Sequence, residues 1–239
     1  MNPNDPVLDR YLKEGYLSRN PTWQSEDSPW KAAIIIDLLK RHRILPVTAA
    51  DVGCGAGGVL ENLRPAFPDA DLFGFDISPN AEKFWGRPQL RGMNFRCGNF
   101  LEDDTRSYDL ILLLDVIEHL ANPFEFLTRL RKRAAHFVLH IPLDLSALTV
   151  LRETPLIRQR NNVGHIHYFT RNLVLALLDE TGYEVVASKY TGAAYFSPQR
   201  TWRTRVAELP RRLARLIDDD WGVRLLGGET LLILARPRK

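Results

Sequence analysis

The chain has 239 residues, 45% of them hydrophobic and 26% charged, which is typical of a globular protein with a sizeable core. A formal net charge of +3 is too small to indicate a general polyanion binder. The two cysteines form neither a disulfide framework nor a metal-binding spacing, and no apolar run reaches membrane-spanning length. The N-terminus also lacks a signal pattern, so we expect a soluble cytoplasmic protein.

Residues 1–30 are polar and interrupted by prolines, yet they contain the large aromatic side chains Tyr11, Tyr16, Trp23 and Trp30. A disordered tail would have few such side chains. We expect this segment to pack on the body of the protein as a lid. Ser28-Pro29 predicts an N-cap followed by proline at the first helical position, with a helix over about 29–43. The side chains expected on its inner face are Ala33, Ile36 and Leu39/Lys40.

From residue 47 onward, short apolar runs alternate with amphipathic segments, which predicts a parallel, doubly wound α/β sheet. The run at 108–115 is continuously apolar, as in a central strand covered on both faces. The expected strands are about 48–52, 72–76, 93–96, 108–115, 135–141, 183–190 and 229–235. The expected helices are about 57–66, 79–84, 123–131 and 170–181, the last with Leu173, Leu177 and Leu178 on one side. The chain shows no repeat or low-complexity linker, so we expect one domain over 1–239 with a basic insertion at 191–228.

The most informative stretch is Asp51-Val52-Gly53-Cys54-Gly55-Ala56-Gly57-Gly58, which joins an expected strand to an expected helix. Glycines allow a tight turn there and bring bare backbone against a ligand. Gly53-x-Gly55-x-x-Gly58 satisfies the dinucleotide fingerprint, and Asp76 lies near the distance expected for a ribose-binding acid. The fingerprint alone allows NAD or a purely structural turn. Asp51, two places before the first glycine, favours a positively charged cofactor instead.

The spacing Asp51-x-Gly53-x-Gly55-x-Gly57 resembles motif I of class I S-adenosylmethionine (SAM) methyltransferases. Asp115-Val116-Ile117-Glu118-His119 resembles the motif that follows a strand in the SAM O-methyltransferases of ubiquinone biosynthesis. The resemblance covers the chain from about residue 30 to its end. It implies a Rossmann-like, mostly parallel seven-stranded sheet closed by an antiparallel C-terminal hairpin.

The same resemblance implies a set of SAM-binding residues: Asp51, Gly53, Cys54, Gly55, Asp76, Ile77, Asn99, Phe100 and Asp115. Asp76 would accept hydrogen bonds from both ribose hydroxyls, and Ile77 and Phe100 would enclose the adenine ring. Asn99 stands where the family often has an acid that binds the adenine amino group, and its carbonyl can accept the same bond. Cys54 is expected to be a small loop residue and no nucleophile, and Asp109 a strand-start residue.

Carboxylates and histidines follow the strongest strand at Asp115, Glu118 and His119, and His165 and His167 precede a later helix. Both loops are expected at the ligand-binding edge of the sheet. In one hypothesis His119 or His165 takes a proton from a hydroxyl during methyl transfer. In a second, Glu118, His119 and His165 bind a divalent metal, which resembles the metal-dependent RNA 3'-end 2'-O-methyltransferases. In a third, Glu118 and His119 only orient each other. His165 is preferred to His167, because alternate residues of an extended stretch face opposite ways.

Residues 200–217 combine arginines with leucines at helical spacing and predict a basic amphipathic helix. Such a helix can contact an anionic membrane, phosphate groups or another polypeptide, or simply dock on the domain. Few base-stacking aromatics accompany the arginines, which argues against a nucleic-acid partner. The sequence therefore predicts a SAM-dependent methyltransferase of a small-molecule hydroxyl, including lipid- or sugar-linked acceptors. The alternatives are metal-assisted methylation of an RNA 3' end and a catalytically silent SAM-binding partner protein.

Overall fold

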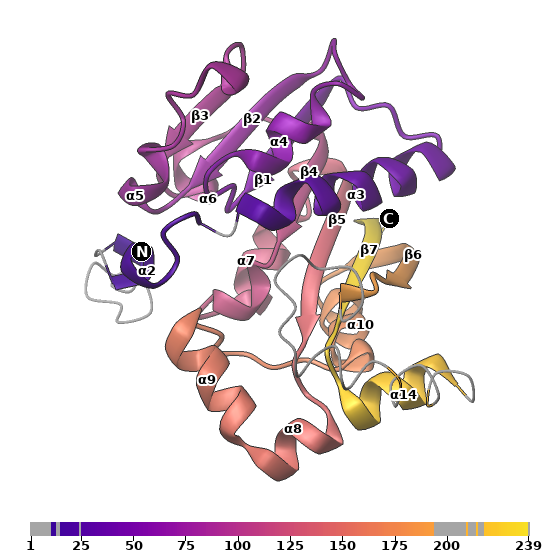
Figure 1. Ribbon diagram of the computed structural model, residues 1–239. Coiled ribbons are helices and arrows are strands. Elements are labelled where there is room, and N and C mark those ends of the chain that lie inside the picture. Colours follow the sequence, from indigo (N-terminus) through magenta and orange to yellow (C-terminus); the bar gives the residue numbers. More distant parts are fainter. Residues whose placement is uncertain are drawn as a thin grey trace.

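The computed structural model describes residues 11–12, 15–23, 25–193, 209, 214 and 218–238. Within these residues, seven strands form one sheet in the order β3-β2-β1-β4-β5-β7-β6 (Figure 1). β1 to β5 pair in parallel, whereas β7 is antiparallel to both β5 and β6. The predicted α/β class and the closing antiparallel hairpin are thereby confirmed. The strands are β1 Thr48–Val52, β2 Asp71–Asp76, β3 Asn94–Cys97, β4 Tyr108–Leu114, β5 Ala134–Leu143, β6 Tyr183–Tyr190 and β7 Glu229–Pro237.

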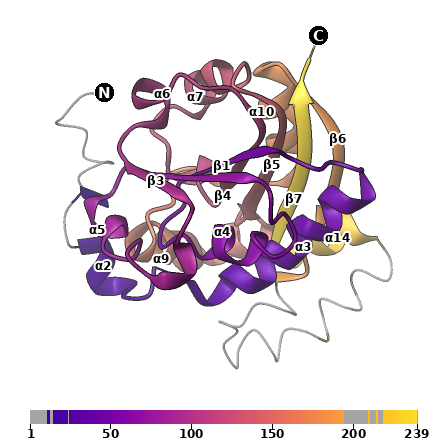
Figure 2. The same ribbon diagram turned by 90° about the horizontal axis from the view of Figure 1, so that it is seen from above.

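Helices cover both faces of the sheet, with α3 and α4 on one face and α6, α7 and α10 on the other (Figure 2). The α-helices are α2 Gly15–Arg19, α3 Ser28–Arg41, α4 Gly58–Leu63, α5 Pro79–Glu82, α6 Phe100–Asp103, α7 Pro123–Leu130, α8 Ala147–Arg152, α9 Thr154–Asn162, α10 Arg171–Glu180 and α14 Asp219–Leu226. Short 3-10 turns are η1 Ser25–Asp27, η2 Pro88–Leu90 and η3 Ile117–His119. Among the described helices, none is both long and apolar enough to cross a membrane.

The central strand β4 supplies side chains to two hydrophobic cores. Ile111 and Leu113 belong to the core that contains residues of α7 and α10. Leu110 and Leu112 belong to the core that contains residues of α3 and α4. Because alternate residues of a strand face opposite sides, a strand buried on both faces needs an unbroken apolar run. This double burial explains why β4 was the clearest strand in the sequence.

Helix α3 differs from its prediction by about one residue. Its buried residues include Ala32, Ile35 and Leu38, whereas the expected inner residue Ala33 is exposed. Ser28 is the first residue of the helix and no N-cap, since Asp27 occupies that position. The predicted inner residue Leu39 is buried, as expected. Ser28 packs closely on the glycine loop: a Cβ on Gly58 would lie 2.5 Å from the Ser28 hydroxyl oxygen.

Other helices lack the apolar periodicity on which the prediction depended. Neither α8 nor α9 contains a buried residue, so no inner face marks them in the sequence. Helix α8 begins instead with a capping box between Ser146 and Thr149. In α10 the inward side chain is Val174, and the expected Leu173 is 49% exposed. The basic helix predicted over 200–217 lies outside the described residues, apart from positions 209 and 214.

We predict that Asp109→Ala destabilises the fold by about 1–3 kcal/mol, because it leaves two backbone N–H groups without their acceptor. The Asp109 carboxylate oxygen Oδ2 accepts from the backbone N–H groups of Val47 and Thr48, each at 2.9 Å. Chemical denaturation measures the change. Asp71→Ala, which removes an exposed carboxylate at the start of the neighbouring strand β2, is the matched control. Equal stability of both variants would show that Asp109 does not hold the two strand starts together.

Candidate active site

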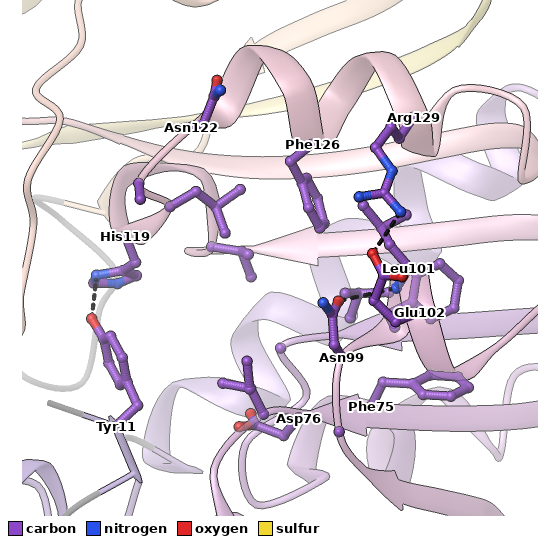
Figure 3. Close-up of a pocket in the computed structure, with 18 of the residues that line it drawn as sticks. Tyr11, Phe75, Asp76, Asn99, Leu101, Glu102, His119, Asn122, Phe126 and Arg129 are labelled. Carbon is purple, nitrogen blue, oxygen red and sulfur yellow. Dashed lines mark hydrogen bonds and ion pairs between the residues drawn. The ribbon is translucent and has the colours of Figure 1, made fainter. Parts of the chain in front are cut away.

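A cavity of about 440 Å³ opens at the carboxyl ends of β1, β2 and β4 (Figure 3). Its walls come from the glycine loop, from the loops after β2, β3 and β4, and from the N-terminal segment. The residues that line the cavity include Trp23, Gly53, Asp76, Asn99, Asp115 and His119. Open α/β sheets bind their ligands at this edge, so the topology places the predicted site where a ligand is expected.

The glycine loop is tied to the end of β2 by its backbone. The N–H groups of Gly53 and Cys54 both donate to the Phe75 carbonyl, at 2.7 and 3.0 Å. Gly53 has a φ of +83°, and a Cβ there would lie 2.6 Å from a methyl group of Val116. Both the backbone conformation and the contact with the loop after β4 therefore require glycine at this position.

Asp76 ends β2 and points its carboxylate toward the cavity (Figure 3). Its two oxygens accept from the backbone N–H groups of Ser78 at 2.8 Å and Gly55 at 2.9 Å. Burial raises the pKa of Asp76 to about 6, against the opposing effect of these hydrogen bonds. Each carboxylate oxygen keeps a further lone pair, so Asp76 can still accept from two ligand hydroxyls.

Asp51 lies behind the cavity wall, together with Cys54 and Gly55. Asp51 is 2% exposed, and its Oδ1 has no hydrogen-bond partner among the described residues. Burial, and then the nearby Asp76 charge, raises the pKa of Asp51 to about 7. Gly55 is covered by Trp23, whose ring carbon Cδ1 would lie 2.3 Å from an added Cβ. Trp23 of the N-terminal segment therefore packs on the glycine loop.

The predicted adenine-binding residues Ile77, Asn99 and Phe100 all line the cavity. The Asn99 side-chain oxygen accepts from the Leu101 N–H at 3.2 Å and caps α6. The Phe100 ring packs edge-on against Phe75 in the core, with ring centroids 4.8 Å apart. Phe126 of α7, which the sequence did not single out, also points into the cavity (Figure 3).

A charged network holds Asp115 at the end of β4. Its two carboxylate oxygens contact Lys31 Nζ at 2.6 Å and His140 Nδ1 at 2.7 Å. Burial alone would raise the pKa of Asp115, but His140 and Lys31 outweigh it and hold the pKa well below its usual range. The Thr230 hydroxyl lies 2.9 Å from His140 Nε2 and completes the network from β7. Asp115 lines the cavity but does not belong to the cluster of Glu118, His119 and His165.

Glu118, His119 and His165 bring three donor atoms within 4.8 Å of one another. The Nε2 atoms of His119 and His165 each lie 3.8 Å from Glu118 Oε1. His165 Nδ1 lies 2.5 Å from a carboxylate oxygen of Asp144, which follows β5. An ionised carboxylate only accepts hydrogen bonds, so Nδ1 carries the His165 proton and Nε2 of the neutral ring presents a lone pair. His167 faces elsewhere, with its Nε2 2.8 Å from the Leu120 carbonyl oxygen.

The Glu118 carboxyl group is fully buried, and neither oxygen has a hydrogen-bond partner among the described residues. Burial, and then the negative charge of Asp115, raises the pKa of Glu118 well above its usual value. Its backbone carbonyl accepts from Ile166 N at 2.9 Å and His167 N at 3.1 Å, which docks the second histidine loop onto the first. The cluster can therefore take up a proton or a cation between Glu118 and two imidazoles.

Several residues that build this site carried no signal in the sequence. Lys31 is one of seven lysines, and its partner Asp115 is 84 residues away. Asp144 directly follows β5, and a single carboxylate after a strand is only a weak signal of a site residue. Tyr11 was noted only as an aromatic residue, yet its hydroxyl oxygen lies 2.7 Å from His119 Nδ1. His140 looked like an ordinary strand residue.

Comparison with known proteins identifies the family. The family model described as "Methyltransferase domain" matches residues 33–188, more than half of the chain. Malonyl-[acyl-carrier protein] O-methyltransferase of Anoxybacillus flavithermus (strain DSM 21510 / WK1) is 26% identical over 131 residues. That match covers 54% of this chain and 51% of the relative, so the chain aligns with about half the length of this relative.

Solved structures with similar folds cover nearly the whole chain. Magnesium protoporphyrin IX methyltransferase from Synechocystis PCC 6803 with bound SAH has a TM-score of 0.63 at 16% identity and 98% coverage of both chains. The plantazolicin methyltransferase BpumL in complex with SAH has a TM-score of 0.61 at 18% identity, covering 98% of this chain and 96% of that chain. These likenesses show a shared fold. The chain therefore belongs to the methyltransferase domain family, and its resemblance to the class I SAM-dependent methyltransferases is confirmed.

Proposed function

We propose that the protein transfers a methyl group from SAM to a hydroxyl of a small molecule, with His119 and His165 as the candidate bases. The single observation that supports this most is the position of the His119 imidazole. His119 lines the cavity, and its Nε2 lies 3.8 Å from Glu118 Oε1 in the cluster of three possible ligand atoms. A hydroxyl must lose a proton when it is methylated, and an imidazole lone pair beside the cavity can accept that proton.

The residues around the cavity fit SAM. Gly53 lines the cavity at the end of β1, and Asp76 offers lone pairs for two ribose hydroxyls. Asn99 and Ile77 would border the adenine, as the resemblance implies. When bound, SAM supplies a methyl group on a positively charged sulfur, which makes that carbon electrophilic. The uncompensated Asp51 carboxyl group lies behind the glycine loop and suits a cationic cofactor.

The residues of this chain would then orient the acceptor and hold its proton. Because methyl transfer requires in-line positioning, the chief task of the cavity is to hold the hydroxyl at one place. His119 Nε2 would take the hydroxyl proton as the acceptor oxygen bonds to the methyl carbon and the bond from that carbon to the sulfur breaks. Glu118 Oε1 lies 3.8 Å from this nitrogen and, once ionised, would stabilise the added positive charge. The proposed acceptors are small-molecule alcohols, lipid- or sugar-linked ones included.

Metal-assisted transfer is the second candidate, and the buried Glu118 carboxylate is the observation that favours it. Two imidazole nitrogens and one carboxylate oxygen are a common set of ligands for zinc and other transition metals. A metal held by Glu118, His119 and His165 would lower the pKa of an acceptor hydroxyl. Asp115 contacts Lys31 and His140 and lies outside the cluster, so a metal there would have three protein ligands.

The proposed function predicts turnover on a hydroxyl compound. Incubation of the protein with methyl-labelled SAM and a metabolite extract from a strain lacking its gene should yield a labelled methyl ether, detected by mass spectrometry. A His119→Ala, His165→Ala double variant should lower the yield by about 100-fold or more. His42 is exposed at the C-terminal end of α3 and outside the histidine cluster, so His42→Ala is the control. SAM binding without any labelled product would instead support the silent-partner alternative.

The structure also predicts that SAM binding depends on the ionised Asp76 carboxylate. Below its pKa of about 6, protonation removes acceptor capacity, so affinity should be full above pH 7 and fall by up to about tenfold per pH unit below 6. Asp76→Asn should weaken binding by about 100-fold at pH 8, because two charge-assisted hydrogen bonds are lost. Calorimetry measures both effects. Asp71→Asn, at the opposite exposed end of β2, should bind like the wild type. An unchanged affinity in Asp76→Asn would refute the ribose role.

For the metal candidate, we predict one bound Zn²⁺ or Mn²⁺ per chain and a loss of affinity of about 100-fold in Glu118→Gln. Equilibrium dialysis with metal analysis measures this without an acceptor. Glu125→Gln is the control, since that carboxylate also lines the cavity but is 63% exposed and outside the cluster. Equal metal binding by both variants would exclude the cluster as the site. Unchanged turnover after exhaustive chelation would leave the imidazole base as the mechanism.

A further inference from the structure

Tyr11 contacts both ends of the candidate active site. Its hydroxyl oxygen lies 2.7 Å from His119 Nδ1, and the two rings pack edge to face with centroids 5.6 Å apart (Figure 3). The same hydroxyl donates to the Val163 carbonyl at 3.2 Å. The backbone carbonyl of Tyr11 accepts from the Ser78 hydroxyl at 2.5 Å, two residues after Asp76. Tyr11 also lines the cavity.

The proton count of these contacts determines the form of His119. A tyrosine hydroxyl has one proton to donate, and the Val163 carbonyl can only accept. If that proton goes to Val163, the hydroxyl oxygen is left as an acceptor, and His119 Nδ1 must supply the donor. Both hydrogen bonds can form together only when the proton of the neutral His119 ring is on Nδ1. In the opposite tautomer, Tyr11 would donate to His119, and its bond to Val163 would be lost.

The Nδ1–H tautomer leaves Nε2 with its lone pair. That nitrogen lies on the side of Glu118 Oε1, at 3.8 Å. We infer that Tyr11 is a positioning residue, which selects the His119 tautomer whose Nε2 can accept a proton or bind a cation at the cavity wall. The inference rests on the proposed role of His119, because a tautomer matters only if Nε2 is used.

The second histidine of the cluster reaches the same state by a different contact. His165 Nδ1 donates to Asp144 at 2.5 Å, so its Nε2 also presents a lone pair toward Glu118 Oε1. A tyrosine and an aspartate thus perform the same function for two adjacent imidazoles. Because the two contacts involve different partners, the His165 tautomer serves as an internal reference when Tyr11 is changed.

The Ser78 contact adds a link to the cofactor side. Ser78 caps α5, and its N–H donates to the Asp76 carboxylate at 2.8 Å. The backbone position of Tyr11 is therefore tied to the loop that carries the candidate ribose acid. A Tyr11→Phe variant keeps the ring and the backbone contact and removes only the hydroxyl. Its effect should be confined to His119 and should leave SAM affinity unchanged.

The test is long-range ¹H–¹⁵N NMR of the histidine side chains in the metal-free full-length protein, at about pH 8, where neutral imidazoles dominate. In the wild type, His119 and His165 should both show protonated Nδ1. In Tyr11→Phe, His119 should shift largely to protonated Nε2, and His165 should stay unchanged. Tyr168→Phe removes another hydroxyl that donates to a backbone carbonyl, that of Leu156 at 3.2 Å, and is the matched control.

With the labelled acceptor in hand, Tyr11→Phe should lower kcat by about tenfold or more while KM and the SAM dissociation constant stay within twofold of the wild type. An unchanged His119 tautomer in Tyr11→Phe would overturn the inference and leave the proposed methyl transfer intact. A shifted tautomer in a protein that methylates nothing would keep Tyr11 as a positioning residue and refute the proposed function. A loss of SAM affinity in Tyr11→Phe, with His119 unchanged, would assign Tyr11 a purely structural role in the lid.

Discussion

The pairing of Asp115 with Lys31 and His140 is the constraint on which the candidate site depends. Charges withdrawn from water must be paired, and removal of one partner leaves the other uncompensated. The three side chains come from the end of β4, from α3 and from β5, so their contacts join three separate elements at one point. Asp115 adopts a left-handed φ of +56°, which turns the chain sharply after β4. Val116 then packs against Gly53, and Glu118 and His119 follow within one short turn. The contacts of Asp115 therefore lie between the glycine loop and the histidine cluster and help to position both.

The parts of this architecture that could be predicted from the sequence are those in which one residue type meets one local requirement. Glycine at position 53 combines a left-handed backbone with a side-chain contact that excludes a Cβ. The apolar run of β4 reflects burial on both faces. Asp76 could be predicted because it ends the apolar run of β2, and a carboxylate at the end of a parallel strand lies at the ligand-binding edge of the sheet. Such local rules were sufficient for the sheet, the glycine loop and the cluster at 118, 119 and 165.

The remaining parts depend on contacts between distant residues, which no local pattern encodes. Tyr11 lies 108 residues before His119, and Lys31 lies 84 residues before Asp115. Helices α8 and α9 contain no buried residue, so hydrophobic periodicity could not detect them. The close packing of Ser28 on Gly58 likewise depends on the three-dimensional approach of α3 to the glycine loop. The sequence-based prediction failed where the position of an element depends on contacts between distant residues and leaves no periodic pattern in the sequence.

The position of β7 in the sheet has a consequence for how the protein is made. β6 precedes β7 in the chain, yet within the described part of the sheet β6 pairs only with β7. While a ribosome is still extending the chain, the edge of β5 therefore stays open and β6 has no partner until β7 emerges. Exposed strand edges template pairing with other chains, so the nascent protein passes through a stage that is prone to aggregation. Because β7 also supplies Thr230, which contacts His140, the hydrogen-bond network around Asp115 at the candidate active site is completed in the same late step.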